Sequence, residues 1–151
     1  MAAGNPHRDA MMAALKDHLV PGLRAKGFKG SFPHFRRVLL PRVDYLTVQF
    51  NTAGGSFVVE VATSSSNGKP QGYGSELPIE KLNTQYFRER FRLGSDSANG
   101  VADHWFQFGP RMYDPIAAVQ SGDFYDRIAQ QILAAFENGG EKWLHSRSVA
   151  A

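Results

Sequence analysis

Three arginines, Arg88, Arg90 and Arg92, alternate with other residues in the segment FRERFRL. Alternate residues of a β-strand point to the same side, so a strand over Phe87–Leu93 would gather three positive charges on one face. Guanidinium groups bind carboxylates and phosphates through paired hydrogen bonds, which makes this face a candidate anion-binding surface. The complete predicted binding surface comprises Arg88, Arg90, Arg92, Tyr45, Gln49, Trp105 and Gln107.

The same arginines also have a purely structural interpretation. An antiparallel sheet that is covered on one side exposes its other side to water, and charged residues there keep it from pairing with other chains. Glu60, in another predicted strand, would neutralise one of the charges. Both interpretations place the arginines on the exposed face of a sheet, and they differ in whether a partner binds there.

No other segment carries a complete catalytic or metal-binding motif. The glycine-rich segment 66–74 contains Lys69, but Pro70 stands where a phosphate-binding loop needs Ser or Thr. The five histidines are scattered, and His104 alternates with aromatic residues, as expected for a core or edge position. The absence of cysteine excludes disulfides and thiolate chemistry. We therefore expect no metal and no cofactor, and we assign no catalytic residue.

Composition and charge set further bounds. The chain has 151 residues, of which 42% are hydrophobic and 21% charged, as is typical of one globular domain. The formal net charge of +3 permits an anionic partner but does not require nucleic acid. The N-terminal segment lacks the pattern of a signal peptide, and no apolar run reaches the ~20 residues of a membrane helix. We expect a cytoplasmic protein with no membrane association.

The central part of the chain predicts a β-hairpin. Apolar residues alternate with others along Val43–Phe50 and again along Phe57–Thr63, as in half-buried strands. Gly54 and Gly55 lie between the two segments and favour a tight antiparallel connection. A hairpin alone is marginal in water, so further strands and a helical cover are required.

The flanking segments supply these elements. Helices are expected from Asn5 to Gly27, with a kink or restart at Pro21, and from Ser121 to Gly139; further strands are expected at Phe32–Leu40, Phe87–Leu93 and Asp103–Phe108. The sequence thus predicts an α+β fold, in which a single antiparallel sheet of about five strands carries an N-terminal and a C-terminal helix on one face. We expect residues 1–151 to form a single domain with loose tails at 1–4 and 146–151, and strand order stays open.

Short motifs along most of the chain resemble, in their order and spacing, one bacterial family, the domain of unknown function 4304 (DUF4304). The motifs are LRAKGFKG at 23–30, FRR at 35–37, VQF at 48–50, FVVEVA at 57–62, RFRLGS at 90–95, DHWF at 103–106 and the closing Trp143-Leu144. The resemblance covers the chain from Met11 to Leu144. It implies a bacterial α+β single domain, and it carries no activity, cofactor or catalytic residue.

These observations favour a non-catalytic module that binds an acidic protein partner through the arginine face. Small bacterial domains of this build are similar to immunity proteins, which neutralise the toxins of competing cells; this is an analogy of class. Two alternatives stay open: an enzyme with a pocket between the sheet and the 64–76 loop, and weak nucleic-acid binding by the arginine strand and Lys69. The sequence does not specify the oligomeric state and is compatible with a homodimer.

Overall fold

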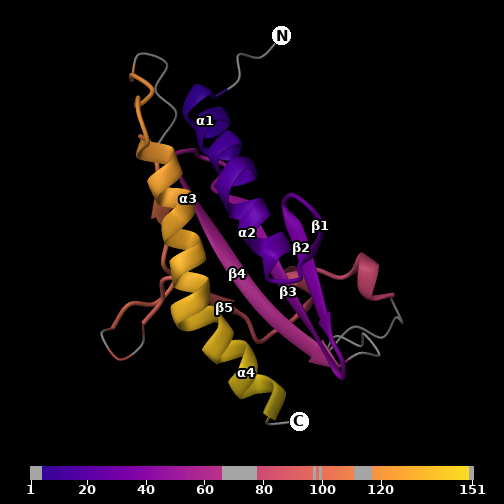
Figure 1. Ribbon diagram of the computed structural model, residues 1–151. Helices are drawn as coiled ribbons and strands as arrows, with labels where there is room; N and C mark the ends of the chain where they lie inside the picture. The colour runs from indigo at the N-terminus through magenta and orange to yellow at the C-terminus, as the bar shows by residue number, and fades with distance from the viewer. Residues whose placement is uncertain (1–4, 66–77, 97, 99, 111–116, 150–151) are drawn as a thin grey trace.

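The computed structural model describes residues 5–65, 78–96, 98, 100–110 and 117–149 (Figure 1). Within these residues, a six-stranded antiparallel sheet packs against two long helical segments that lie side by side on one of its faces. The strand order is β1–β2–β3–β4–β5, and β6 also pairs with β4. The strands are β1 Lys29–Ser31, β2 His34–Leu39, β3 Arg42–Phe50, β4 Ser56–Ser65, β5 Phe91–Arg92 and β6 Phe106–Gln107. The predicted α+β architecture is confirmed.

The N-terminal helical segment follows the sequence closely. It consists of α1 (Pro6–Ala14), a π-helical turn (Leu15–Leu19) and α2 (Val20–Ala25). The Asn5 side chain caps its start by accepting hydrogen bonds from the backbone N–H groups of His7 and Arg8. The predicted restart at Pro21 takes the form of the π turn directly before it, because a proline cannot donate to the carbonyl of the preceding turn.

The central hairpin is confirmed, since the whole of β3 pairs with residues 57–65 of β4. Where the sequence predicts one strand over Phe32–Leu40, the structure has β2 and an additional short strand, β1, that folds back onto it. Successive register pairs across β2, β3, β4 and β5 place His34, Thr47, Glu60 and Arg92 in one row. Side chains in such a row project from the same face of the sheet.

The predicted strands Phe87–Leu93 and Asp103–Phe108 are too long, because only β5 and β6 within them pair with β4. Phe87 packs on the sheet face away from the helices, whereas Phe91 packs on the helix face. Residues four apart in a straight strand would share a face. The chain must therefore turn over between Phe87 and Phe91, and this turn excludes a continuous strand.

The C-terminal helical segment runs without interruption through α3 (Phe124–Ala135), a second π turn (Phe136–Gly140) and α4 (Glu141–Val149). Two predictions are wrong here: Ser121 is not the N-cap, since the helix begins after Asp123, and Gly139 does not end the helix. The glycines permit close packing instead, because a Cβ on Gly140 would lie 2.9 Å from both Leu93 and Phe136. α4 also extends into the segment that the sequence predicts as a tail.

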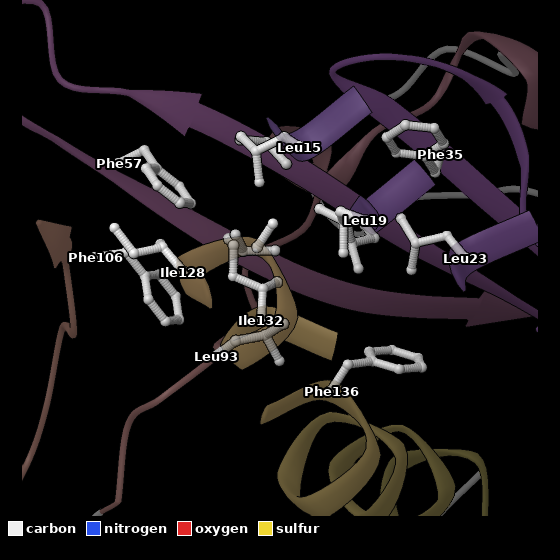
Figure 2. Close-up of a cluster of buried hydrophobic side chains, with 14 of the residues drawn as sticks. Leu15, Leu19, Leu23, Phe35, Phe57, Leu93, Phe106, Ile128, Ile132 and Phe136 are labelled. Atoms are coloured by element: carbon white, nitrogen blue, oxygen red, sulfur yellow. The ribbon is translucent and has the colours of Figure 1, made fainter. Parts of the chain in front are cut away.

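The main core lies between the two helical segments and the sheet (Figure 2). Its buried members include Leu15, Leu19, Leu23, Phe35, Phe57, Leu93, Phe106, Ile128, Ile132 and Phe136. The alternation predicted for the hairpin is confirmed on this face, where Leu46, Val48, Val59 and Val61 are buried. Removal of this apolar surface from water is the main force that holds the helices on the sheet.

A buried ionic cluster lies near the start of α4 and joins residues of two strands to this helix. Arg37 of β2 donates from Nη2 to Asp44 Oδ2 of β3 at 2.8 Å and also to Glu141 at the start of α4. Its guanidinium carbon lies 4.7 Å from the ring centroid of Phe28 and 5.5 Å from that of Phe136. Burial alone would lower the pKa of Arg37, but the hydrogen bonds and charges of the two carboxylates outweigh it and raise the pKa. The cluster thus joins two strands to the C-terminal helix through a permanent charge.

Candidate functional site: an arginine groove

The sequence predicted that the sheet face away from the helices is open to solvent. In the structure this face is covered. Segment 79–87 crosses this face and packs on it, forming a second apolar cluster of Val43, Tyr45, Ala62, Leu82 and Phe87, with Ile79 and Tyr86 at its border. Tyr45 is fully buried, and its ring centroid lies 5.0 Å from that of Phe87. A ring in this position cannot be the exposed aromatic anchor that the sequence predicted. The sequence does contain a signal of this burial: Val43 and Tyr45 are both apolar, although they lie on the face that was predicted to be polar.

The buried Tyr45 hydroxyl makes the stability of the folded protein depend on pH. Burial raises the pKa of Tyr45, so the folded protein holds this proton more tightly than the unfolded chain does. The contribution to stability is therefore fully present below about pH 10 and is lost as the pH rises further. Between about pH 8 and about pH 11 we expect the free energy of unfolding, measured with urea, to fall more in the wild type than in Tyr45→Phe. Tyr86→Phe, at a partly exposed position, is the control, and equal falls in the wild type and Tyr45→Phe would contradict the assignment.

The other predicted binding residues do not form one surface. Gln49 and Gln107 are exposed, but they line two different cavities. Arg88 is exposed and lies outside β5. Of the predicted set, Arg90 and Arg92 lie together, because both lie at the edge of β4 where β5 pairs, and Trp105 lies against Arg92.

Arg90 and Arg92 line a groove of 430 Å³, named here the arginine groove, between β5, residues 95 and 101–103, and α4. Its charged lining residues are Arg90, Arg92, Arg147, Glu60 and Asp103. Three guanidinium groups thus meet two carboxylates in the lining, and Glu89, outside the lining, lies 3.4 Å from Arg147. The groove is a candidate for an anionic ligand because guanidinium groups bind carboxylates and phosphates through paired hydrogen bonds.

The carboxylates hold the arginines without saturating them. Glu60 Oε1 lies 3.6 Å from Arg90 Nη1, and Glu60 Oε2 lies 3.7 Å from Arg92 Nη2. Asp103 Oδ1 is 3.9 Å from Arg92 Nη1. A charge-assisted hydrogen bond spans about 2.7–2.9 Å, so these contacts are attractions between charges, and within the described residues they leave N–H donors of both arginines unused. Arg92 Nε is buried and has no hydrogen-bond partner within the described part of the chain.

Aromatic rings fix the orientation of two of the guanidinium groups. Phe91 and Trp143 are stacked, with centroids 5.9 Å apart and planes inclined by 22°. The guanidinium carbon of Arg147 lies 5.3 Å from the Trp143 centroid, and that of Arg92 lies 5.4 Å from the centroid of Trp105. A ring that covers the face of a guanidinium leaves its N–H edge available to a carboxylate or phosphate. The groove thus combines oriented donors with an adjacent apolar surface.

Several residues of the arginine groove were not predicted from the sequence. Trp143 and Arg147 are one helical turn apart and share a helix face, a spacing visible in the sequence, but the segment was interpreted as a turn followed by a tail. Asp103 has no sequence signal. It adopts φ 53°, a left-handed conformation that Asp tolerates better than most residues with a side chain.

None of the five histidines lines the groove. The ring of His104 meets that of Phe106 edge-on at 4.7 Å, in agreement with the predicted core or edge position. In the described ranges, no group of three or more His, Cys, Asp or Glu residues could hold a metal. The pocket expected between the sheet and the 64–76 loop, and Lys69 with it, lies outside the described residues. No helix among the residues that the structure describes is long and apolar enough to cross a membrane.

Comparison with known protein families matches residues 19–146 to a domain of unknown function (DUF4304). The match covers most of the chain and spans all of the short motifs, so the resemblance based on them is confirmed. No curated protein and no solved structure matches the chain.

Proposed function

We propose a binding function for this chain, which belongs to the DUF4304 family of domains of unknown function: the arginine groove holds an acidic segment of a partner protein, and the chain catalyses no reaction. The proposal is carried by the convergence of three guanidinium groups, two of them stacked on tryptophans, around one groove. Partner carboxylates would accept from the free N–H donors, and the apolar parts of the same segment would cover Phe91 and Trp143.

By analogy with immunity proteins, we further propose that this is a single-domain protein of the bacterial cytoplasm whose partner is a toxin-like protein with an acidic surface. Its mechanism would be occlusion, in which the bound module covers the partner's own working surface. The absence of cysteine suits a reducing compartment. Charged residues at the groove would also accelerate the encounter with an acidic partner.

In this proposal, Glu60 competes with the partner's carboxylates for the arginines of the groove. Its side chain is 10% exposed and lies between two of the arginines, so an incoming carboxylate must displace it or bind beside it. Glu60→Gln keeps the size of the side chain and removes its charge. This variant is expected to bind the partner about tenfold more tightly than the wild type.

The test is an affinity pull-down from native lysate with the full chain, followed by titration of the captured protein against purified variants. We expect one stoichiometric protein, and we expect Arg90→Glu/Arg92→Glu to lower its affinity by at least about 100-fold, because reversed charges would face the partner's carboxylates. Arg24→Glu/Arg127→Glu makes the same change of charge at exposed positions elsewhere. This control should change the affinity by no more than about twofold.

Three outcomes would overturn the proposal. The first is an unchanged affinity in both Arg90→Glu/Arg92→Glu and Glu60→Gln; because Glu60→Gln gains affinity, a folding defect cannot imitate its effect. The second is a pull-down that captures no protein. The third is capture of nucleic acid whose affinity falls steeply between low and physiological salt, which would assign the groove to phosphate binding.

A further inference from the structure

A second cavity, of 390 Å³, lies between α1 and the far end of β3. None of its lining residues also lines the arginine groove. The lining combines aromatic rings, amides, one histidine and one arginine: Phe32, Phe50, Gln49, Gln85, His34 and Arg8. Its volume falls within the range of about 300–1,000 Å³ that is usual for small-molecule sites.

The cavity lies where β3 loses its neighbour. The last register pair between β2 and β3 is His34↔Thr47, yet β3 continues to Phe50. Val48 N–H donates to Pro33 O at 3.0 Å, so the main-chain groups of Val48, and of Phe50 two residues on, point toward the β2 side. Within the described residues no strand lies opposite Phe50 there. Its N–H and C=O groups therefore border the cavity as one donor and one acceptor.

The polar lining is neutral apart from one cation. His34 Nδ1 lies 3.1 Å from Thr47 Oγ1, which also accepts from Thr84 N–H at 3.3 Å. Burial lowers the pKa of His34, which keeps its ring uncharged at neutral pH. The charge comes from Arg8, whose guanidinium carbon lies 5.0 Å from the Phe50 ring centroid. None of the described residues that line the cavity is acidic.

We propose that this cavity binds a small aromatic carboxylate. Phe32 and Phe50 are both partly exposed and would contact a planar ring, while Arg8 would hold the carboxylate through paired hydrogen bonds. The amides of Gln49 and Gln85 would meet a further polar group of the ligand. Arg8 is the one permanent cation among the described lining residues, and Lys16, outside the lining, lies 5.8 Å from the centroid of Phe32; this suits a ligand of low negative charge better than a polyanion. This site goes beyond the proposed protein-binding function and does not depend on it.

Isothermal titration of the full chain with cinnamate tests the proposal. We expect saturable binding of one molecule per chain. Cinnamyl alcohol has the same ring system without the charge, and acetate has the charge without the ring. Each is expected to bind at least about tenfold more weakly than cinnamate, because each lacks one of the two interactions.

Variants then locate the site. Gln49→Glu places a negative charge in the lining of the cavity and is expected to lower the affinity for anionic cinnamate at least about tenfold, whereas Gln130→Glu, at an exposed position of α3, should have no effect. Arg90→Glu/Arg92→Glu should bind cinnamate as the wild type does, which separates this site from the arginine groove. Lack of saturable binding at millimolar cinnamate, or equal affinity in Gln49→Glu and the wild type, would overturn the proposal.

Discussion

Arg37→Met is expected to lower the free energy of unfolding by about 3–5 kcal/mol, the usual result of removing one partner from a buried ion pair. The Arg37 side chain is 6% exposed and that of its partner Asp44 is 0% exposed. Methionine fills much of the same volume but leaves the Asp44 carboxylate in the core with one remaining arginine, Arg42, at 3.1 Å. The substitution also releases Glu141, and with it a link between the sheet and α4.

Urea denaturation followed by circular dichroism measures this effect. Arg36→Met is the matched control, because the same change is made one residue earlier, at a partly exposed position on the opposite face of β2; its cost should stay below about 1 kcal/mol. Arg37→Met/Asp44→Asn removes both charges and should recover at least about 1 kcal/mol. Equal costs for Arg37→Met and Arg36→Met would show that the buried cluster does not stabilise the fold.

Gly55→Ala is expected to cost about 3 kcal/mol, through two separate mechanisms. Gly55 adopts φ +77°, which is strained for any residue with a side chain. Its carbonyl accepts hydrogen bonds from the N–H groups of Phe108, at 2.9 Å, and Gly109, at 3.2 Å, so the segment after β6 lies directly against it. A Cβ would come within 2.7 Å of the Pro110 carbonyl carbon and still closer to its oxygen. Because these neighbours are backbone, they cannot move aside without breaking the contact.

Gly122→Ala separates the two mechanisms. Gly122 has nearly the same conformation, φ +70°, but a Cβ there would meet nothing within 4 Å. The control should therefore show only the conformational cost of about 1–2 kcal/mol. If thermal and urea denaturation give equal losses for the two variants, the close crossing at Gly55 does not exist in solution.

The middle of the outer sheet face is covered, so the two ends of this face remain for ligand binding. Segment 79–87 is held to the middle of the sheet by the hydrogen bond from Thr84 N–H to Thr47. The row of register pairs that contains Thr47 begins at His34, beside the small cavity, and ends at Arg92, in the arginine groove. Both proposed sites thus border the same sheet, whose hydrogen-bonded backbone limits the main-chain ordering that ligand binding costs.

The sequence by itself determined the elements whose signals are local. The Asn5 cap acts on N–H groups within three residues, and the hairpin follows from alternation on either side of Gly54 and Gly55. Such signals need only neighbours along the chain, so the helix start, the hairpin, the α+β class and the family could all be predicted. Arg90 and Arg92 were nominated for the same reason.

Some residues fit two environments equally well by their local sequence, and only the tertiary structure decided which environment each of them occupies. Tyr45 is buried because a distant segment covers it, and Gly140 allows a close approach to Leu93 rather than ending a helix. The arginine groove depends on Glu60 of β4 and Arg147 of α4, which are far apart in the chain, lining the same cavity. The physical reason is the same in each case: burial and charge pairing depend on contacts between distant segments, and the local pattern of a sequence does not contain them.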